Sequence, residues 1–204
     1  MSGAKPSRRR RFAEAFFSSL FAPLRVESEV WFWVRECVTF APGAIGVSAR
    51  RAFYRRSFRR SGDDIVIMAG AYIEHPQNVE VGDRCTFGRN CWIGAHAPLK
   101  LGNDVGVGPS VIIHTANHRF DDRNVPILQQ GHDEKPVEIE DDVWLAAGAR
   151  VMPGTRIGRG AVIAAGSVIS GPIEPYAIMV GFPARRIGVR GAAAKEREPN
   201  DAIA

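Results

Sequence analysis

The side chain best suited to acid–base chemistry in this sequence is that of His118, which ends the segment TANH at residues 115–118. An imidazole has an unperturbed pKa near ~6.5, so at neutral pH it can accept a proton from an attacking hydroxyl group. The polar residues Asp121, Asp122 and Arg123 follow closely. This arrangement predicts a general base beside polar groups that bind an acceptor; an ordinary surface histidine in a solvated loop is the alternative.

A repeat of six residues runs through the chain from Ile65 onward. In residues 139–174 the first position of each hexapeptide is aliphatic six times in succession, and the fifth position is small or β-branched until Ile173. The same spacing recurs upstream, in Val81, Phe87 and Ile93 and again in Leu101, Val107 and Ile113. A helix would need a period of 3.6 and an ordinary strand a period of two, so neither explains the pattern.

A period of six predicts a triangular prism, with one short strand and one turn in each hexapeptide and three hexapeptides in each coil. The aliphatic first residue points inward, and the small fifth residue fills the remaining space. Each coil buries its aliphatic row only against its neighbours. We therefore expect an all-β main domain over residues 63–187, with about five coils stacked to a height of ~24 Å.

The period is interrupted once, by the polar residues 117–136, and it resumes at Ile139. A long loop that leaves a regular solenoid is more often functional than not, and a tolerated insertion is the alternative. Counting from Ile113, His118 is the sixth residue of its hexapeptide, a position that faces outward. Because it lies where the coil gives way to the loop, a cleft is expected there.

Residues 1–62 have a different pattern from the repeats. Apolar residues recur every four positions from Phe12 to Leu24, residues 30–34 are apolar, and residues 44–60 combine aromatic side chains with arginine. These features predict a helical N-terminal segment. Residues 1–60 contain 13 basic and 4 acidic residues, a net of +9, within a chain of net charge +5. Residues 188–204 are expected to form a disordered tail.

Composition limits the class of protein. A chain of 204 residues, 45% hydrophobic and 24% charged, suits one globular domain with an appendage. No uncharged run reaches the ~18 residues of a membrane-spanning helix, and Glu14 interrupts the first apolar run, which argues against a cleaved signal peptide. Cys37, Cys85 and Cys91 lack a CxxC spacing, so we expect reduced thiols in a cytoplasmic protein and no metal.

With its repeats and three motifs, the sequence resembles the hexapeptide-repeat acyltransferases, which fold as a left-handed parallel β-helix. The motifs are TANH at 115–118, VWLAAG at 143–148 and GFPARRI at 181–187. The resemblance covers roughly residues 65–187. It is greatest to sugar O-acetyltransferases of the galactoside and maltose type and to relatives in cell-surface polysaccharide synthesis. The left-handed sense comes from the family and not from the period.

The resemblance implies direct transfer of an acetyl group from acetyl-CoA to a sugar hydroxyl. His118 matches the family's general base, and the amide at or near Ala147 matches its oxyanion donor. Ala147, Ala165 and Ser170 match positions that contact the pantetheine arm of CoA. Relatives often have Thr-Lys where this chain has Ser170-Gly171, so one cationic contact to a CoA phosphate is in doubt.

Further site residues follow from the same resemblance. Arg185, Arg186 and Arg190 could pair with CoA phosphates, although a solvated basic terminus is the alternative. Trp144 aligns with an aromatic residue of the family's active-site groove, and a surface aromatic that covers the prism edge is its alternative. The substrate candidates are Asn90, near the position where some relatives have an asparagine, and Asp121 on the loop.

The family's members form trimers with each active site between neighbouring columns, so a homotrimer is implied. Some polysaccharide-related members have segments similar to PGAIG at 42–46 and RRAFYRR at 50–56. Aromatic, arginine-rich helices suit an anionic membrane surface, so residues 8–60 predict peripheral attachment to the inner face of the cytoplasmic membrane, near a lipid-linked saccharide. Helices packed on the first coil are the alternative. Nucleic-acid binding is not expected, because no binding motif accompanies the basic arm.

Three other functions stay open at this point. A γ-class carbonic anhydrase on the same fold would use His96, His114 and His118 as zinc ligands, but that class expects H-x4-H and this chain has His114-x3-His118. A non-catalytic β-helix scaffold is the second possibility, because fold does not imply function. The third is an acyltransferase that modifies an amine, serine or an antibiotic with the same base.

Overall fold

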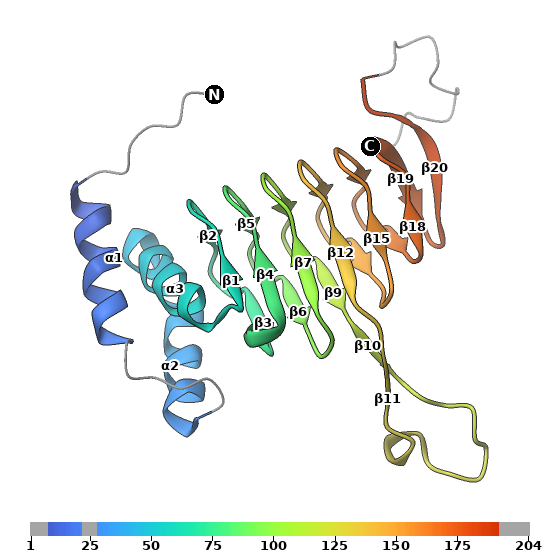
Figure 1. The fold of residues 1–204 in the computed structure, drawn as a ribbon, viewed down its shortest axis with the longest axis horizontal. Coiled ribbons are helices and arrows are strands. Elements are labelled where there is room, and N and C mark those ends of the chain that lie inside the picture. Colours follow the sequence, from blue (N-terminus) through green and yellow to red (C-terminus); the bar gives the residue numbers. More distant parts are fainter. Residues whose placement is uncertain (1–7, 22–27, 192–204) are drawn as a thin grey trace.

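The column of repeats has three parallel sheets as its sides, as the computed structural model shows for the described residues, 8–21 and 28–191 (Figure 1). Sheet A contains β1 (Arg60–Ser61), β4 (Val79–Val81), β7 (Leu99–Leu101), β12 (Val137–Ile139), β15 (Arg156–Ile157) and β18 (Pro172–Ile173). Sheet B contains β2 (Val66–Ile67), β5 (Thr86–Phe87), β8 (Gly106–Val107), β13 (Trp144–Leu145), β16 (Val162–Ile163), β19 (Ala177–Gly181) and β20 (Ala184–Val189). Sheet C contains β3 (Tyr72–Glu74), β6 (Trp92–Gly94), β9 (Ile112–His114), β14 (Arg150–Val151) and β17 (Val168–Ile169).

The chain passes from sheet A to B to C in each coil, which makes five complete coils and a sixth that ends after β19. The expected all-β main domain, a parallel β-helix of hexapeptide repeats, is confirmed. The first residue of each hexapeptide lies inside the column, as in Ile93, Ile113, Leu145 and Ile163, all of which are fully buried. Strand β20 closes the column by pairing antiparallel with β19, so the expected domain boundary at residue 187 falls inside a strand. Residues 192–204 of the expected tail lie outside the described residues.

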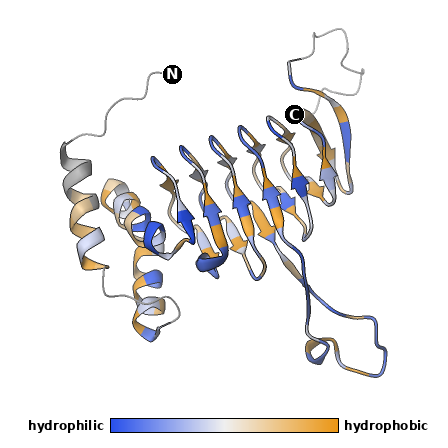
Figure 2. Ribbon diagram, in the orientation of Figure 1, coloured by the Kyte–Doolittle hydropathy of each residue, from blue (hydrophilic) through white to orange (hydrophobic). Residues whose placement is uncertain are grey.

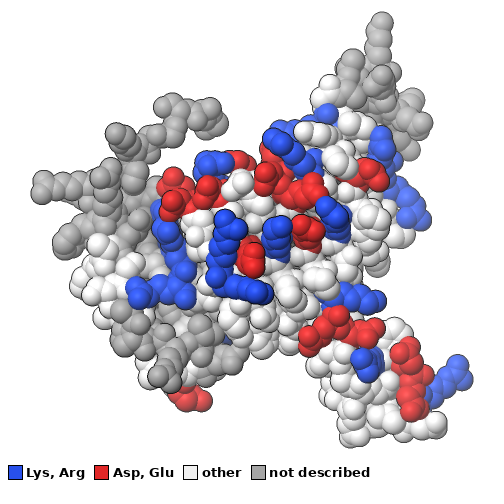
Figure 3. Space-filling view, viewed as in Figure 1, with Lys and Arg blue, Asp and Glu red and all other residues white. Residues whose placement is uncertain are grey.

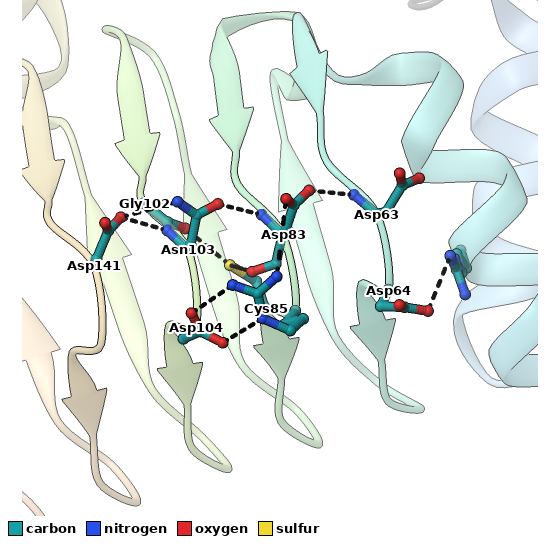
Figure 4. A network of polar contacts seen from close by, with 10 residues as sticks. Asp63, Asp64, Asp83, Cys85, Gly102, Asn103, Asp104 and Asp141 are labelled. Atoms are coloured by element: carbon teal, nitrogen blue, oxygen red, sulfur yellow. Dashed lines mark hydrogen bonds and ion pairs between the residues drawn. The ribbon is translucent and has the colours of Figure 1, made fainter. Parts of the chain in front are cut away.

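Stacked side chains hold the coils in register at the corner between sheets A and B (Figure 4). The Asp63 backbone N–H donates to Asp83 Oδ1 at 2.7 Å, that of Asp83 to Asn103 Oδ1 at 2.8 Å, and that of Asn103 to Asp141 Oδ1 at 2.7 Å. Each of these bonds joins one coil to the next. Because a turn buried against its neighbour needs partners for its N–H groups, an acceptor side chain recurs at this corner.

The outer face of sheet A carries charges of alternating sign (Figure 3). Parallel pairing places Arg60 beside Glu80, Glu80 beside Lys100, Lys100 beside Glu138 and Glu138 beside Arg156. Lys100 Nζ lies 3.3 Å from Glu138 Oε1. Each exposed pair contributes little to stability, but together they make this side of the column a polar, solvent-facing surface.

Three helices form a cap beside the first coil: α1 (Arg8–Leu20), α2 (Glu29–Thr39) and α3 (Gly43–Ser57), of which α1 packs against α3. The helical N-terminal segment is therefore confirmed, as is the alternative in which it packs on the column, since α3 contacts β1 and β2. Arg50 links this helical cap to the column through hydrogen bonds. Its fully buried guanidinium donates to the carbonyl oxygens of Val38, Thr39, Ala41 and Ile67, and so joins the end of α2 to sheet B.

The three cysteines are free, and the burial of two of them raises the pKa of their thiols. The pKa of Cys85 is raised to about 11 and that of Cys91 to about 12. Both side chains therefore stay protonated and act as small core residues.

No helix in residues 8–21 and 28–191 has the length and apolar character needed to cross a membrane.

Candidate active site

The polar interruption of the repeat folds back on itself as a hairpin that extends from the column (Figures 1 and 2). Its strands are β10 (Ala116–His118) and β11 (His132–Glu134), with a 3-10 turn at Ile127–Gln129. Residues 117–136 were expected to be a loop, and the structure differs because the two ends pair as antiparallel strands. His118 is exposed and lies directly across from His132.

A buried threonine anchors this hairpin to the column. Thr115 Oγ1 accepts a hydrogen bond from the Ala97 N–H at 2.8 Å and donates one to the Gly94 carbonyl at 3.2 Å. The Thr115 carbonyl accepts from the Lys135 N–H at 2.8 Å, where the second strand returns. The base of the hairpin is thus fixed to the second coil, which positions the His118 strand.

Four imidazoles form a continuous row along the corner between sheets C and A. The ring centroid of His118 lies 4.3 Å from that of His132, His132 lies 5.8 Å from His96, and His96 lies 4.6 Å from His75. We call this row the histidine edge. The hexapeptide period could not reveal it, because His132 joins only through the pairing of the hairpin strands.

His114 lies close to this row but packs against the indole of Trp92, at 4.4 Å between ring centroids. Burial, and secondarily the nearby His96, lowers the pKa of His114, so its ring stays neutral near pH 7. The three histidines of the zinc hypothesis, His96, His114 and His118, are not grouped to hold a metal within the described part of one chain. Within residues 8–21 and 28–191, no three His, Cys, Asp or Glu side chains are grouped to hold a metal.

Small residues meet at the opposite side of sheet C, at the corner between sheets B and C. Ala147 and Ala165 are both exposed there, one coil apart, and the Gly166 N–H donates to the Ala147 carbonyl at 2.9 Å. The Ala147 N–H makes no hydrogen bond within the described part of the chain, which suits the expected oxyanion donor. We call this corner the small-residue edge.

Asn90 also lies on the small-residue edge and not beside His118. It occupies the left-handed turn position, with φ of 55°, that Ser110, Gly148 and Gly166 occupy in later coils. Asparagine tolerates this conformation better than most residues, so a local role explains Asn90. Within one chain the structure therefore does not bring this substrate candidate to the base.

The remaining candidates for CoA are divided between elements. Ser170 follows β17 and begins the corner between sheets C and A, so strand β17 separates it from Ala165. Arg185 is exposed on β20. Arg190 Nη1 lies 2.8 Å from Asp142 Oδ2, so its guanidinium is already paired at the corner between sheets A and B.

Trp144 and Asp121 lie on exposed surfaces. Trp144, on β13 of sheet B, is 56% exposed, and its ring lies beside Gly106, where a Cβ would come within 3.4 Å of it. Such a flat exposed ring can pack against a ligand. Asp121 is exposed on the hairpin, whereas its neighbour Asp122 accepts a bond from the Asn124 N–H and stabilises the local turn.

Two family descriptions match this chain. Residues 136–171 match "Bacterial transferase hexapeptide (six repeats)", and residues 78–113 match "Hexapeptide repeat of succinyl-transferase". Both segments consist of coils of the column, one on each side of the hairpin. The segments that match the two family descriptions therefore coincide with hexapeptide repeats predicted from the period of six.

Curated relatives agree with these matches. Nodulation protein L of Rhizobium meliloti is 35% identical over 68% of this chain and 73% of its own length. A galactoside O-acetyltransferase of Lactococcus lactis is 33% identical over 63% of this chain and 62% of its own length. A protein named a probable acetyltransferase of Mycobacterium tuberculosis is 33% identical over 64% of this chain, and the match spans 45% of that relative.

Solved structures share the fold. A hexapeptide-repeat acetyltransferase of Vibrio cholerae, in complex with acetyl-CoA, is 27% identical with a TM-score of 0.69, over 78% of this chain and 84% of that chain. A galactoside acetyltransferase in complex with coenzyme A has a TM-score of 0.65 at 21% identity, over 89% of this chain and 80% of that one. The chain belongs to the hexapeptide-repeat acetyltransferase family, as its motifs and repeats predicted.

Proposed function

We propose that this protein is an acetyl-CoA-dependent O-acetyltransferase that acetylates a hydroxyl group of a saccharide. The observation that carries the proposal is the placement of His118 on an ordered hairpin anchored by buried Thr115, where its imidazole is exposed to an acceptor. A galactoside O-acetyltransferase among its relatives supports the saccharide. The complex of a structural relative with acetyl-CoA supports the donor.

The proposed reaction is a direct transfer. His118 removes the proton of the acceptor hydroxyl while the oxygen attacks the thioester carbonyl carbon, so a new C–O bond forms. The carbonyl π electrons move to oxygen, and an N–H group such as that of Ala147 stabilises the oxyanion. When the intermediate collapses, the C–S bond breaks and the CoA thiolate takes the proton from the His118 imidazolium. Neither a nucleophilic side chain nor a metal takes part.

The position of the two edges supports a site built between copies of the chain. His118 lies on the histidine edge, whereas Ala147 and Ala165 lie across sheet C on the small-residue edge. In a closed ring, unlike surfaces of neighbouring copies meet at each interface. We propose a homotrimer in which the histidine edge of one copy faces the small-residue edge of the next. The ion-paired outer face of sheet A then stays in solvent.

The helical cap supports a location at the cytoplasmic face of a membrane. Val30 and Trp33 of α2 and its C-cap residue Phe40 follow one another at spacings of three and seven, which places them on one side of the helix. All three are exposed, and Trp33 is 72% exposed. Together with the net charge of +9 in residues 1–60, this stripe suits an anionic lipid surface. The proposed acceptor is then a saccharide of cell-surface polysaccharide or glycolipid synthesis.

Flotation with vesicles tests this location. The full-length protein should float with phosphatidylcholine–phosphatidylglycerol vesicles and much less with phosphatidylcholine alone. The double variant Trp33→Ser/Phe40→Ser should float less with the anionic vesicles. Equal flotation of the double variant and the unaltered protein would reject the stripe as a lipid contact.

Calorimetric titration and kinetics test the reaction itself. Acetyl-CoA should bind at about one per subunit, and His118→Ala should bind it equally well but lose ~10²–10⁴-fold in turnover on a panel of sugars. Gln129→Ala, an exposed substitution on the same hairpin, should retain turnover. Near-normal turnover of His118→Ala, or the absence of acetyl-CoA binding by a folded protein, would contradict the proposal.

A further inference from the structure

A pocket of about 590 Å³ opens between α2 and the first two coils. Phe32 and Arg35 of α2 line one side, and Tyr72, Glu74 and His96 line the other. Apart from the zinc hypothesis for His96, none of these residues was expected to take part in the chemistry. The pocket lies at the far end of the histidine edge, since His96 reaches His118 only through His132.

The lining combines aromatic faces with a few polar groups, the usual composition of a small-molecule site. Phe32 is 38% exposed, and Tyr72 is half-buried. Glu74 offers carboxylate oxygens, and His96 offers ring nitrogens. Burial raises the pKa of Tyr72, so its hydroxyl stays protonated and can both donate and accept a hydrogen bond.

The charges in the pocket argue against a phosphate or carboxylate ligand. Arg35 is only 7% exposed, and its guanidinium carbon lies 4.2 Å from the ring centroid of Tyr72 and 4.9 Å from that of Phe32. Its Nη2 is 3.2 Å from Glu36 Oε1. The arginine is therefore covered by rings and paired through Nη2, while its buried Nε, which has no partner in the described structure, can donate to a neutral hydroxyl oxygen. An anion would also meet the carboxylate of Glu74. A neutral ligand with an apolar face and several hydroxyl groups fits these surroundings.

We propose that this pocket is a second saccharide subsite, which holds a neutral sugar ring beyond the ring that is acetylated. The inference rests on the proposed acetyl transfer at His118. A saccharide of two or more rings can lie along the histidine edge, so that one ring packs against the exposed part of Phe32 and the reacting hydroxyl of another ring lies at His118. The subsite selects extended acceptors over monosaccharides.

Kinetics with acceptors of increasing length test the subsite. With acetyl-CoA as donor, kcat/KM for maltotriose or lactose should exceed that for glucose or galactose by ~10-fold, the scale of one well-stacked ring. Phe32→Ala should reduce this ratio at least fivefold. Phe16→Ala, which truncates an exposed ring of α1 away from the pocket, should preserve it. An unchanged ratio in Phe32→Ala, or no preference for length in the unaltered protein, would overturn the subsite.

Binding in the absence of acetyl-CoA separates this inference from the reaction. In saturation-transfer NMR, maltotriose and lactose should bind the unaltered protein and His118→Ala alike, and Phe32→Ala more weakly. If such binding is seen but no sugar is acetylated, the subsite stands and the proposed reaction fails. If sugars are acetylated but neither oligosaccharide binds, or Phe32→Ala binds as the unaltered protein does, the reaction stands and the subsite fails.

Discussion

The two edges of sheet C differ in the residues that they carry and in how the chain turns there. The histidine edge holds large polar rings, and its third coil extends outward as the β10–β11 hairpin. The small-residue edge carries Ala147, Ala165 and short left-handed turns such as those at Gly148 and Gly166. One edge thus projects the exposed imidazole of His118, and the other has only small side chains at its surface.

This difference is the basis of the proposal that a complete site forms between two copies of the chain. Sheet C separates His118, the proposed base, from the amide of Ala147, the proposed oxyanion donor. A reaction that needs both requires a second copy that turns its other edge toward the first. The four predictions below test this division of labour, from the largest expected effect to the smallest.

Mixing two inactive variants should restore activity. His118→Ala removes the base, and Ala147→Trp fills the surface of the other edge, so each variant alone should lose almost all turnover. After the two are unfolded and refolded together in equal amounts, ~25% of the interfaces in a trimer combine two intact edges. Turnover should return to about that fraction. If the mixture stays as inactive as the separate variants, the two edges act within one chain.

Loss of the hydrogen bonds that anchor the hairpin should lower stability and turnover more than the same substitution at an exposed position. Thr115→Val keeps the shape but leaves the Ala97 N–H without its acceptor in the interior, which costs ~1–3 kcal/mol. Urea unfolding measures this loss, and turnover should fall because the His118 strand is less well fixed. Thr86→Val, the same change at an exposed position on β5, should alter stability by less than ~0.5 kcal/mol. Equal effects of the two substitutions would refute the anchor.

The stability of the turns on the small-residue edge should depend on glycine, because the backbone there adopts a left-handed conformation. Gly166 has φ of +68° with no atom within 4 Å of an added Cβ, so Gly166→Ala costs only the strain of a left-handed turn, ~1–2 kcal/mol. Gly188→Ala on β20 meets ordinary contact at 3.9 Å without that conformation and should be nearly neutral. Thermal unfolding of both variants checks the difference. Equal stabilities would show that the turn relaxes.

His114, which lies close to the histidine edge, should make the stability of the protein sensitive to acid. Burial lowers the pKa of His114 in the folded protein below the ordinary 6.5, so the unfolded chain binds the proton first. The contribution of neutral His114 is present above about pH 6.5 and is lost as the pH falls through the folded pKa. Urea unfolding at pH 7.5 and 5.5 should show a smaller loss for His114→Gln than for the unaltered protein. The same loss in both would assign the pH dependence to other groups.

Much of the fold could be read from the sequence because the prism repeats one local rule. An aliphatic residue every six positions, as in Ile139, Leu145 and Val151, suffices to predict the coils, since each position meets the same surroundings as its equivalent in the next coil. The cap was less accessible. Its helices have clear periodicity, but the bonds of Arg50 to carbonyls of α2 and β2 depend on packing between distant segments.

The candidate site could be predicted only in part. The motif identified His118 and placed it facing outward, and the structure agrees that it is exposed. The motif did not reveal His132, because antiparallel pairing of the hairpin strands joins residues that the hexapeptide count treats as unrelated. Asn90 and Arg190 stay predictions: the structure places Asn90 in a left-handed turn of the small-residue edge and pairs Arg190 with Asp142, neither of which the spacing indicated.

The sequence by itself determined the solenoid, its one interruption and the candidate base His118, because hexapeptide periodicity and a short motif are local properties of the chain. The tertiary structure decided which corner of the prism each residue occupies. It placed His118 and the small residues on opposite edges, linked His118 to His96 through His132, and formed the pocket beside Phe32. These relations join residues from different coils and helices, so only the packing of those elements could reveal them.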